Sequence, residues 1–332
     1  MKKLMGLFLA AALITGLLAG CAGTPAGNNG TSTPESTPAT TETSAAEPSE
    51  SDESAWPRTY VDATGAEVVI EKQPERVAVV HALEIESVYA LGVIPIAAGD
   101  ADAIINGYAT LEGLRGKGVI DLGGSASPNL EKLLEAEPDL IIATYYTQGE
   151  MWDELKKIAP VVALKIPDPY AYTDALREYA EVLGRENEVE QVIDDRYAKL
   201  EDARQKLASI DETVVQVFLS NGKVGSIQGS TIWTLYDAEE GLGLKAPEGL
   251  PETWQEISLE GLAELNPDHI LIGVSSDSEG QAISDEYASS TVWNSLTAVK
   301  NNQVYIIDSS ILNGQAYGMP ILIDYILERL VK

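Results

Sequence analysis

The sequence has few cysteine, histidine and basic side chains, which carry much of protein chemistry. Its 332 residues include one cysteine, two histidines and 22 Lys and Arg side chains, against 52 Asp and Glu. A single cysteine excludes a framework of intrachain disulfides. A formal net charge of -30 argues against nucleic acid as a partner, because affinity for phosphates depends on basic side chains. The same charge disfavours a surface that lies directly on anionic lipid.

The motifs of hydrolytic enzymes are missing as well. The sequence has no Gly-x-Ser-x-Gly elbow and no His-Glu-x-x-His motif. A Ser-His-Asp triad could use only His81 or His269, and no pattern frames either of them. No His/Asp/Glu cluster resembles a bare-metal site. We therefore expect neither an enzyme nor a resident cofactor or metal, with a surface hydrolase as the alternative.

The N-terminal apolar run is short for a membrane span. Lys2 and Lys3 precede about 15 apolar residues at 4–18, whereas a spanning helix needs roughly 20. The run ends in Leu-Ala-Gly-Cys, which resembles a bacterial lipobox. We expect residues 1–20 to be a signal peptide and Cys21 to carry a lipid anchor, with an ordinary secretory signal as the alternative. The Thr-, Ser- and Pro-rich stretch 21–56 predicts a disordered tether outside the membrane, and its length favours a Gram-positive cell surface.

The rest of the chain alternates short apolar runs with amphipathic segments, which predicts an α/β fold with mostly parallel sheets in two Rossmann-like lobes. The expected strands are 77–80, 94–98, 139–143, 161–164, 214–219, 268–272 and 303–307. The expected helices are 84–91, 129–137, 152–158, 173–183, 186–207, 259–265 and 317–331. The longest of them would span ~33 Å, which suits a connection between two lobes. We therefore predict an N-terminal lobe at 57–185, a connecting helix at 186–208 and a C-terminal lobe at 209–332.

One motif occurs in both halves of the chain. The segment 129–142 resembles the segment 258–271, and in each of them six residues separate a glutamate from a Pro-Asp pair. Each segment is expected to form a helix followed by a strand. The motif predicts a structural pseudo-repeat that places a surface glutamate, Glu131 or Glu260, at the same point of each lobe.

From about Tyr60 onward, nine short motifs follow one another in a fixed order. They are TYVDATG at 59–65, QPERV at 73–77, LGV at 91–93, NLE at 129–131, PDLII at 138–142, IAP at 158–160, ISLE at 257–260, NPD at 266–268 and WNSLTAVK at 293–300. In this order and spacing they resemble the substrate-binding proteins of iron-siderophore, haem and cobalamin ABC importers. The resemblance implies a monomer whose two rigid lobes hold the ligand between them. It also implies that Glu131 and Glu260 pair with arginines of an ABC permease. The alternative is two solvated acids on helix faces.

Candidate ligand-binding residues follow the predicted strands, because ligands of parallel sheets bind beyond the carboxyl ends of the strands. The residues selected in this way are His81, Tyr145, Tyr146, Asn221, Trp233 and Tyr317, with Thr144, Gln148, Asn313 and Gln315 beside them. The resemblance to cobalamin-binding relatives adds Trp254. This set is aromatic and rich in amides, and nearby cations such as Lys165 are scattered. It favours a near-neutral ferric hydroxamate siderophore, which itself coordinates the iron. Haem, a corrinoid, and a ligand-independent adhesion or sensor module are the alternatives.

Overall fold

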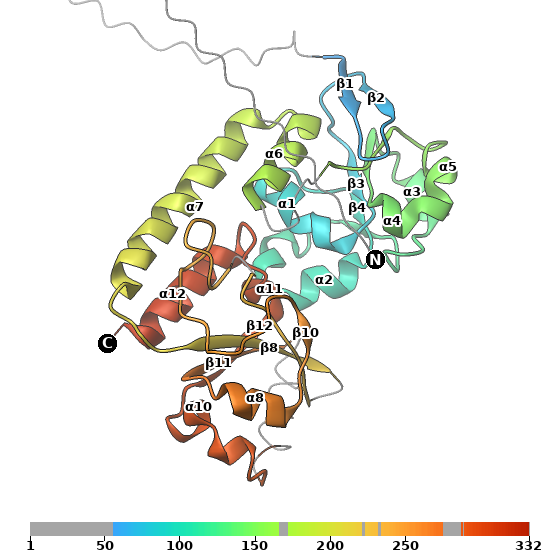
Figure 1. The fold of residues 1–332 in the computed structure, drawn as a ribbon. Helices are drawn as coiled ribbons and strands as arrows, with labels where there is room; N and C mark the ends of the chain where they lie inside the picture. Colours follow the sequence, from blue (N-terminus) through green and yellow to red (C-terminus); the bar gives the residue numbers. More distant parts are fainter. Residues whose placement is uncertain are drawn as a thin grey trace, which may run out of the picture. The chain divides into compact units, whose positions relative to one another are not determined.

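The computed structural model describes residues 56–165, 172–220, 223–231, 234–274, 287 and 289–331. These residues belong to one compact unit at 52–332, in which two five-stranded sheets define two lobes (Figure 1). The expected signal peptide, Cys21 and all of the tether before residue 56 lie outside the described residues. Within the described part of the chain, no helix is both long and apolar enough to cross a membrane.

The first lobe contains an entirely parallel sheet with the strand order β5-β4-β3-β6-β7. Its strands are β3 (Val77–Val79), β4 (Ala97–Ala98), β5 (Ile120–Asp121), β6 (Leu140–Ile142) and β7 (Val161–Val162). Its α-helices are α1 (Ile85–Ala90), α2 (Ala101–Gly107), α3 (Leu130–Glu135), α4 (Tyr145–Gln148), α5 (Trp152–Leu155) and α6 (Tyr172–Leu183). Short 3₁₀ helices are η2 (Ala82–Glu84), η3 (Ala109–Leu114) and η4 (Gly149–Met151). An antiparallel hairpin of β1 (Arg58–Val61) and β2 (Glu67–Ile70) precedes the sheet.

The second lobe contains a mixed sheet with the order β10-β9-β8-β11-β12. Its strands are β8 (Val214–Ser220), β9 (Lys223–Ile227), β10 (Gln255–Glu256), β11 (His269–Val274) and β12 (Val304–Asp308). Strands β8, β11 and β12 are parallel, whereas β9 is antiparallel to β8 and β10 is antiparallel to β9. Its helices are α8 (Leu259–Leu265), η5 (Trp293–Ser295), α10 (Thr297–Lys300), α11 (Ser309–Leu312) and α12 (Gly318–Leu330).

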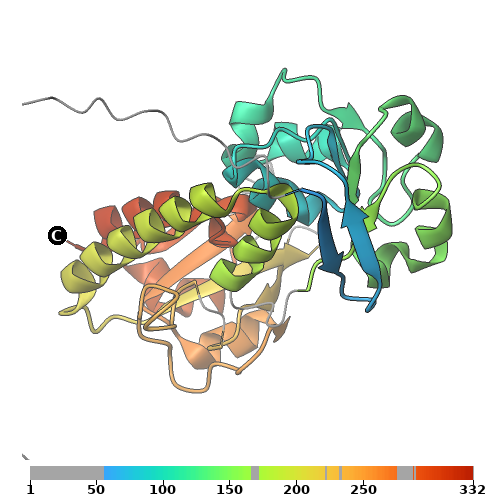
Figure 2. The same ribbon diagram turned by 90° about the horizontal axis from the view of Figure 1, so that it is seen from above.

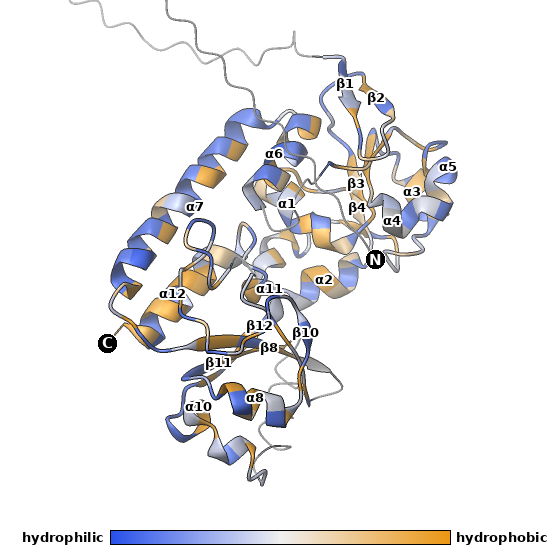
Figure 3. Cartoon of the chain, viewed as in Figure 1, coloured by the Kyte–Doolittle hydropathy of each residue, from blue (hydrophilic) through white to orange (hydrophobic). Residues whose placement is uncertain are grey.

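Helix α7 (Glu186–Leu207) leads from the first lobe to the second and lies along α12 (Figures 1 and 2). Lys199 of α7 ties the pair together, because its ammonium donates to Asp324 and to the carbonyl of Pro320, both at 2.8 Å. Much of α7 is hydrophilic, whereas the central strands β3 and β8 are hydrophobic (Figure 3). The helix therefore packs with one face only and leaves the other in solvent.

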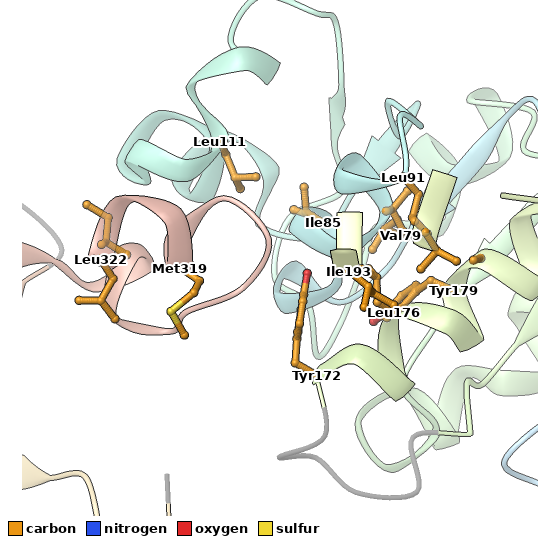
Figure 4. Close-up of a cluster of buried hydrophobic side chains, with 14 of the residues drawn as sticks. Val79, Ile85, Leu91, Leu111, Tyr172, Leu176, Tyr179, Ile193, Met319 and Leu322 are labelled. Atoms are coloured by element: carbon orange, nitrogen blue, oxygen red, sulfur yellow. The ribbon is translucent and has the colours of Figure 1, made fainter. Parts of the chain in front are cut away.

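The apolar core is continuous between the lobes. One cluster of buried side chains covers one face of the first sheet, the inner faces of α6, α7 and α12, and one face of the second sheet. Figure 4 shows members from both lobes, including Val79, Ile85 and Leu111 from the first and Met319 and Leu322 of α12 from the second. Two further clusters cover the opposite faces of the two sheets. Because interiors pack densely, a shared core restricts relative motion of the lobes.

The motif that occurs twice in the sequence starts in the same way in both lobes. Asn129 Oδ1 accepts hydrogen bonds from the N–H groups of Glu131 and Lys132, both at 3.0 Å, and so caps α3. Ser258 Oγ accepts from Gly261 N at 3.1 Å and caps α8. A side-chain cap fixes where a helix begins, because it satisfies N–H groups that have no partner inside the helix. Each helix therefore begins one residue before its glutamate.

The two units also end alike. The residue before each Pro-Asp pair has a left-handed backbone, at Glu137 (φ 48°) and at Asn266 (φ 38°). The carboxylate of Asp139 then accepts the N–H that directly precedes β3 at 2.9 Å. The carboxylate of Asp268 accepts the N–H that directly precedes β8 at 2.8 Å. The structure thus confirms the pseudo-repeat, and the repeated aspartate connects each unit to the strand next to it.

All seven predicted strands and all seven predicted helices are present, although several are shorter than expected. The strand expected at 94–98 is reduced to β4, because Pro95 has no N–H to give to a parallel ladder. The sequence does not predict the β1–β2 hairpin, α2, α4, β5, β9, β10, α10 or α11. β5 and β10 have two residues each, which is too short to produce a periodic pattern.

Candidate ligand-binding cleft

A cavity of about 800 Å³ lies beyond the carboxyl ends of β3 and β6. These two strands are neighbours at the point where the strand order of the first sheet reverses, which is the usual ligand position in open α/β sheets. Most of its described lining comes from the first lobe, and Asn313 and Gln315 contribute from the second. The cavity is therefore interlobe, and its volume is typical of sites for small molecules.

The segment after β3 forms one wall of the cavity. Ala82 N donates to Ser125 Oγ at 3.0 Å, and this hydroxyl donates to Asp100 at 2.6 Å. His81 caps η2 by accepting from Leu83 N at its Nδ1, at 3.4 Å. Burial lowers the pKa of His81, although Asp100 opposes this effect. A neutral ring with an acceptor at Nδ1 carries its proton at Nε2, so His81 can donate one hydrogen bond.

The segment after β6 forms the adjoining wall. Thr144 N donates to Gln148 Oε1 at 2.8 Å, and the amide of Gln148 donates to the carbonyl of Ser125 at 2.7 Å. Gln148 is fully buried, so these two bonds join the walls beneath the surface. Tyr145 is 50% exposed and meets the Trp152 ring edge-on, with 5.2 Å between ring centroids. The Tyr145 ring is therefore held in place while one part of it remains available for contact.

Glu84 is one of the residues that line the cavity, and it carries a carboxyl group. Its Oε1 accepts from Thr144 Oγ1 at 2.5 Å, whereas its Oε2 is buried and has no hydrogen-bond partner among the described residues. Burial raises the pKa of Glu84 from 4.5 to about 7, and the hydrogen bond from Thr144 acts in the opposite direction. Both protonation states are therefore populated near neutral pH.

The third wall is aromatic and carries one cation. Tyr172 and Tyr179 of α6 are buried and line the cavity. Lys165 is exposed, and its ammonium lies 5.7 Å from the centroid of the Tyr60 ring. Among the described residues that line the cavity, Lys165 is the only Lys or Arg. The described lining thus offers packing surface and neutral hydrogen-bonding groups rather than a cluster of cations.

The lobes are also joined at the start of α12. Glu86 of α1 accepts the N–H groups of Tyr317 at 3.0 Å and Gly318 at 3.4 Å, at the start of α12. The Tyr317 ring stacks on Tyr89, with centroids 5.1 Å apart. A second cavity of about 380 Å³ lies at this junction, lined by Tyr317 and residues of α7. The junction therefore combines hydrogen bonds with ring stacking.

The residues predicted to bind ligand do not all line the same cavity. His81 and Tyr145 line the interlobe cavity together with Thr144, Asn313 and Gln315. Tyr317 lines the smaller cavity at the lobe junction, and Trp254 is 55% exposed and absent from the described lining of both cavities. The side chain of Tyr146, and Asn221 and Trp233 as a whole, lie outside the described residues. The role of all seven in ligand binding stays a prediction.

Sequence reasoning missed part of the lining, namely Glu84, Tyr172 and Tyr179. The sequence pattern predicts Glu84 at the start of a helix, although it follows the end of a strand as closely as a cleft residue would. The two tyrosines are seven residues apart on α6, a spacing that puts them on one helix face but equally suits the core. No group of three or more His, Cys, Asp or Glu able to hold a metal occurs in the described part of the chain.

The two predicted docking residues occupy matching positions. Glu131 and Glu260 are both exposed, and each is the second residue of its capped helix. A glutamate at this position also interacts favourably with the free N–H groups of the first turn. Their matched placement is a property of the pseudo-repeat, and their contact with a permease stays a prediction.

Two α/β lobes that enclose a cavity at their strand ends and share one connecting helix define a two-lobed ligand-binding protein. A family model described as Periplasmic binding protein matches residues 77–311. The Fe(3+)-citrate-binding protein YfmC of Bacillus subtilis is 31% identical over 241 residues, which cover 71% of this chain and 73% of YfmC. The iron(3+)-hydroxamate-binding protein YxeB of the same species is 28% identical over 236 residues, which cover 65% of this chain and 69% of YxeB.

The crystal structure of Staphylococcus aureus SirA complexed with staphyloferrin B has the same fold, with a TM-score of 0.66 and 24% identity over 82% of this chain and 98% of SirA. The iron-uptake system-binding protein FeuA of Bacillus subtilis matches with a TM-score of 0.67 and 21% identity over 82% of this chain and 100% of FeuA. The chain belongs to the periplasmic binding protein family. The resemblance drawn from its sequence and the predicted fold class are confirmed.

Proposed function

We propose that this protein captures a ferric siderophore in its interlobe cavity and delivers it to an ABC permease, with a hydroxamate-type chelate as the favoured ligand. The observation that carries the proposal is the cavity of about 800 Å³, whose described lining is rich in tyrosine and neutral polar groups. Tyrosine rings pack on the organic frame of a chelate, while hydroxyl and amide groups bond to its oxygens. The chelate holds the iron, so no metal ligand is required from the protein.

The names of the relatives support iron chelates but leave more than one ligand class open. YxeB and FhuD of Bacillus subtilis are named for iron(3+)-hydroxamate, whereas YfmC is named for Fe(3+)-citrate. A ferric citrate complex is multiply anionic, and its recognition usually requires several cations. The described lining offers only Lys165 and a neutral His81. This shortage of positive charge favours the hydroxamate class.

The membrane anchor is part of the same proposal. Two further relatives from Bacillus subtilis, YhfQ and YfiY, are called lipoproteins in their names. A lipid on Cys21 would keep the lobes at the outer face of the membrane, close to a permease. The lipid would supply the attachment, and the acidic surface would keep the lobes in solvent. Loss of membrane attachment in a Cys21→Ser variant would be the expected result.

Native mass spectrometry of residues 52–332 mixed with ferric trihydroxamate, ferric triscatecholate, ferric citrate, haem and cobalamin tests the proposed ligand. The expected result is a 1:1 complex with the ferric trihydroxamate and none with the iron-free chelator. Selective retention of ferric citrate would replace the hydroxamate assignment with a carboxylate one. Binding of haem or cobalamin alone would overturn the siderophore assignment.

A further inference from the structure

Only one of the two oxygens of the Glu84 carboxyl group has a hydrogen-bond partner among the described residues. Its Oε1 accepts from Thr144 Oγ1 at 2.5 Å. Its Oε2 is buried and has no hydrogen-bond partner among the described residues, although Glu84 forms part of the cavity wall. An unpaired acceptor in a desolvated position is unfavourable, so its retention calls for a partner that the described part of the chain does not supply.

The charge of Glu84 is likewise uncompensated. No ion pair between Glu84 and a Lys or Arg occurs in the described part of the chain. The nearby His81 is a neutral ring because burial lowers its pKa. Burial raises the pKa of Glu84 to about 7, so the carboxylate predominates at pH 8. A partner that brings positive charge or an N–H donor would therefore be complementary to this wall.

We propose that Glu84 determines specificity by accepting a hydrogen bond from a cationic or N–H-bearing arm of the bound iron chelate. This inference rests on the proposed function and refines its ligand class. A carboxylate in a cavity interacts more strongly with a charged partner than it would in water, because the effective dielectric constant is lower. It attracts a chelate with an ammonium arm and repels one with a free carboxylate, and this repulsion contributes to specificity as much as the attraction does.

Two synthetic probes test the inference on the unaltered protein. One is a linear ferric trihydroxamate that ends in a primary amine, and the other is the same chelate with that amine acetylated. Their affinities are measured by quenching of tryptophan fluorescence at pH 8. We expect the amine probe to bind at least about tenfold more tightly, since hydrogen bonds to charged groups contribute more than neutral ones. Equal affinities overturn the inference while leaving the proposed function intact, whereas no binding of either probe overturns both.

The Glu84→Gln variant tests whether the preference for the amine probe depends on Glu84. It keeps an acceptor for Thr144 but removes the charge, so the preference for the amine probe should fall to less than about threefold. Exchange of Glu135, an exposed carboxyl on α3, for Gln serves as the matched control and should leave the preference unchanged. Circular dichroism verifies that both variants are folded. A folded Glu84→Gln protein with the full preference for the amine would overturn the assignment to Glu84.

Discussion

Because the Glu84 carboxyl is buried, we predict that the free energy of unfolding depends on pH even without a ligand. Its pKa is raised by burial from 4.5 to about 7, so the folded chain binds this proton more tightly than the unfolded chain does. Such a group contributes stability that is present below pH 4.5 and is lost as the pH rises to about 7. One pKa unit corresponds to about 1.4 kcal/mol, so the loss is at most about 3 kcal/mol.

The Glu84→Gln substitution removes this titration while keeping a similar side-chain shape. We expect the free energy of unfolding of the variant, relative to the wild type, to increase by about 2 kcal/mol between pH 5 and pH 8. Urea unfolding at pH 5, 6, 7 and 8 measures this difference in the free energy of unfolding. Unchanged m-values would show that only stability differs between the two proteins. The exposed Glu135→Gln control should show no such trend. A difference between wild type and Glu84→Gln that is constant across this pH range would refute the reasoning.

Three further predictions concern docking, the lobe junction and the cleft. Replacing Glu131 and Glu260 together by Ala should leave ligand affinity intact but abolish import of a ⁵⁵Fe-labelled chelate into cells. The reason is that the proposed arginine–carboxylate pairs with the permease would be lost on both lobes. Glu86→Ala should lower the free energy of unfolding by about 2 kcal/mol or more in urea, because two N–H groups at the start of α12 lose their acceptor. Trp254→Ala should weaken chelate binding by ~1–3 kcal/mol in a fluorescence or calorimetric titration if this exposed ring contacts the ligand.

Each of these predictions has its own control or contrary outcome. The exposed Glu135 and Glu264 lie one turn further along α3 and α8, so a double Ala variant at these two positions should import normally. Normal import by the Glu131 and Glu260 variant would show that docking uses other residues. A change in unfolding free energy below about 0.5 kcal/mol for Glu86→Ala would mean that the junction does not depend on it. Unchanged affinity after Trp254→Ala would remove this ring from the site.

The elements that the sequence predicts well are those with a strong local pattern. Helix α7 matches its expected range, because 22 residues without Gly or Pro leave few alternatives. Strand β6 is a continuous apolar run, as buried parallel strands are. The pseudo-repeat was visible because its caps and its Pro-Asp pair occur at fixed spacings. In each case the information lies within one short stretch of chain.

The features that the sequence did not yield depend on contacts between distant stretches. The hydrogen bond between Glu84 and Thr144 joins residues 60 positions apart, and no local pattern in either segment predicts it. Tyr317 was expected beyond the last strand, yet α11 separates it from β12 and its ring stacks on Tyr89 at the lobe junction. Tyr172 and Tyr179 have the spacing of a core stripe, and only the tertiary structure brings them to the cavity wall. A helix-period pattern identifies the buried face of α6 but cannot distinguish core from cavity lining.

We infer that the interlobe cavity, rather than the smaller cavity at the lobe junction, receives the iron chelate. Ala175 on α6 lines this cavity and Ala90 lines the smaller one, and both are only partly buried. Titration of a ferric trihydroxamate into the wild type, Ala175→Trp and Ala90→Trp proteins compares the two cavities directly. We predict saturable binding by the wild type and Ala90→Trp proteins and its loss in a folded Ala175→Trp protein. Undiminished binding by Ala175→Trp would contradict the claim.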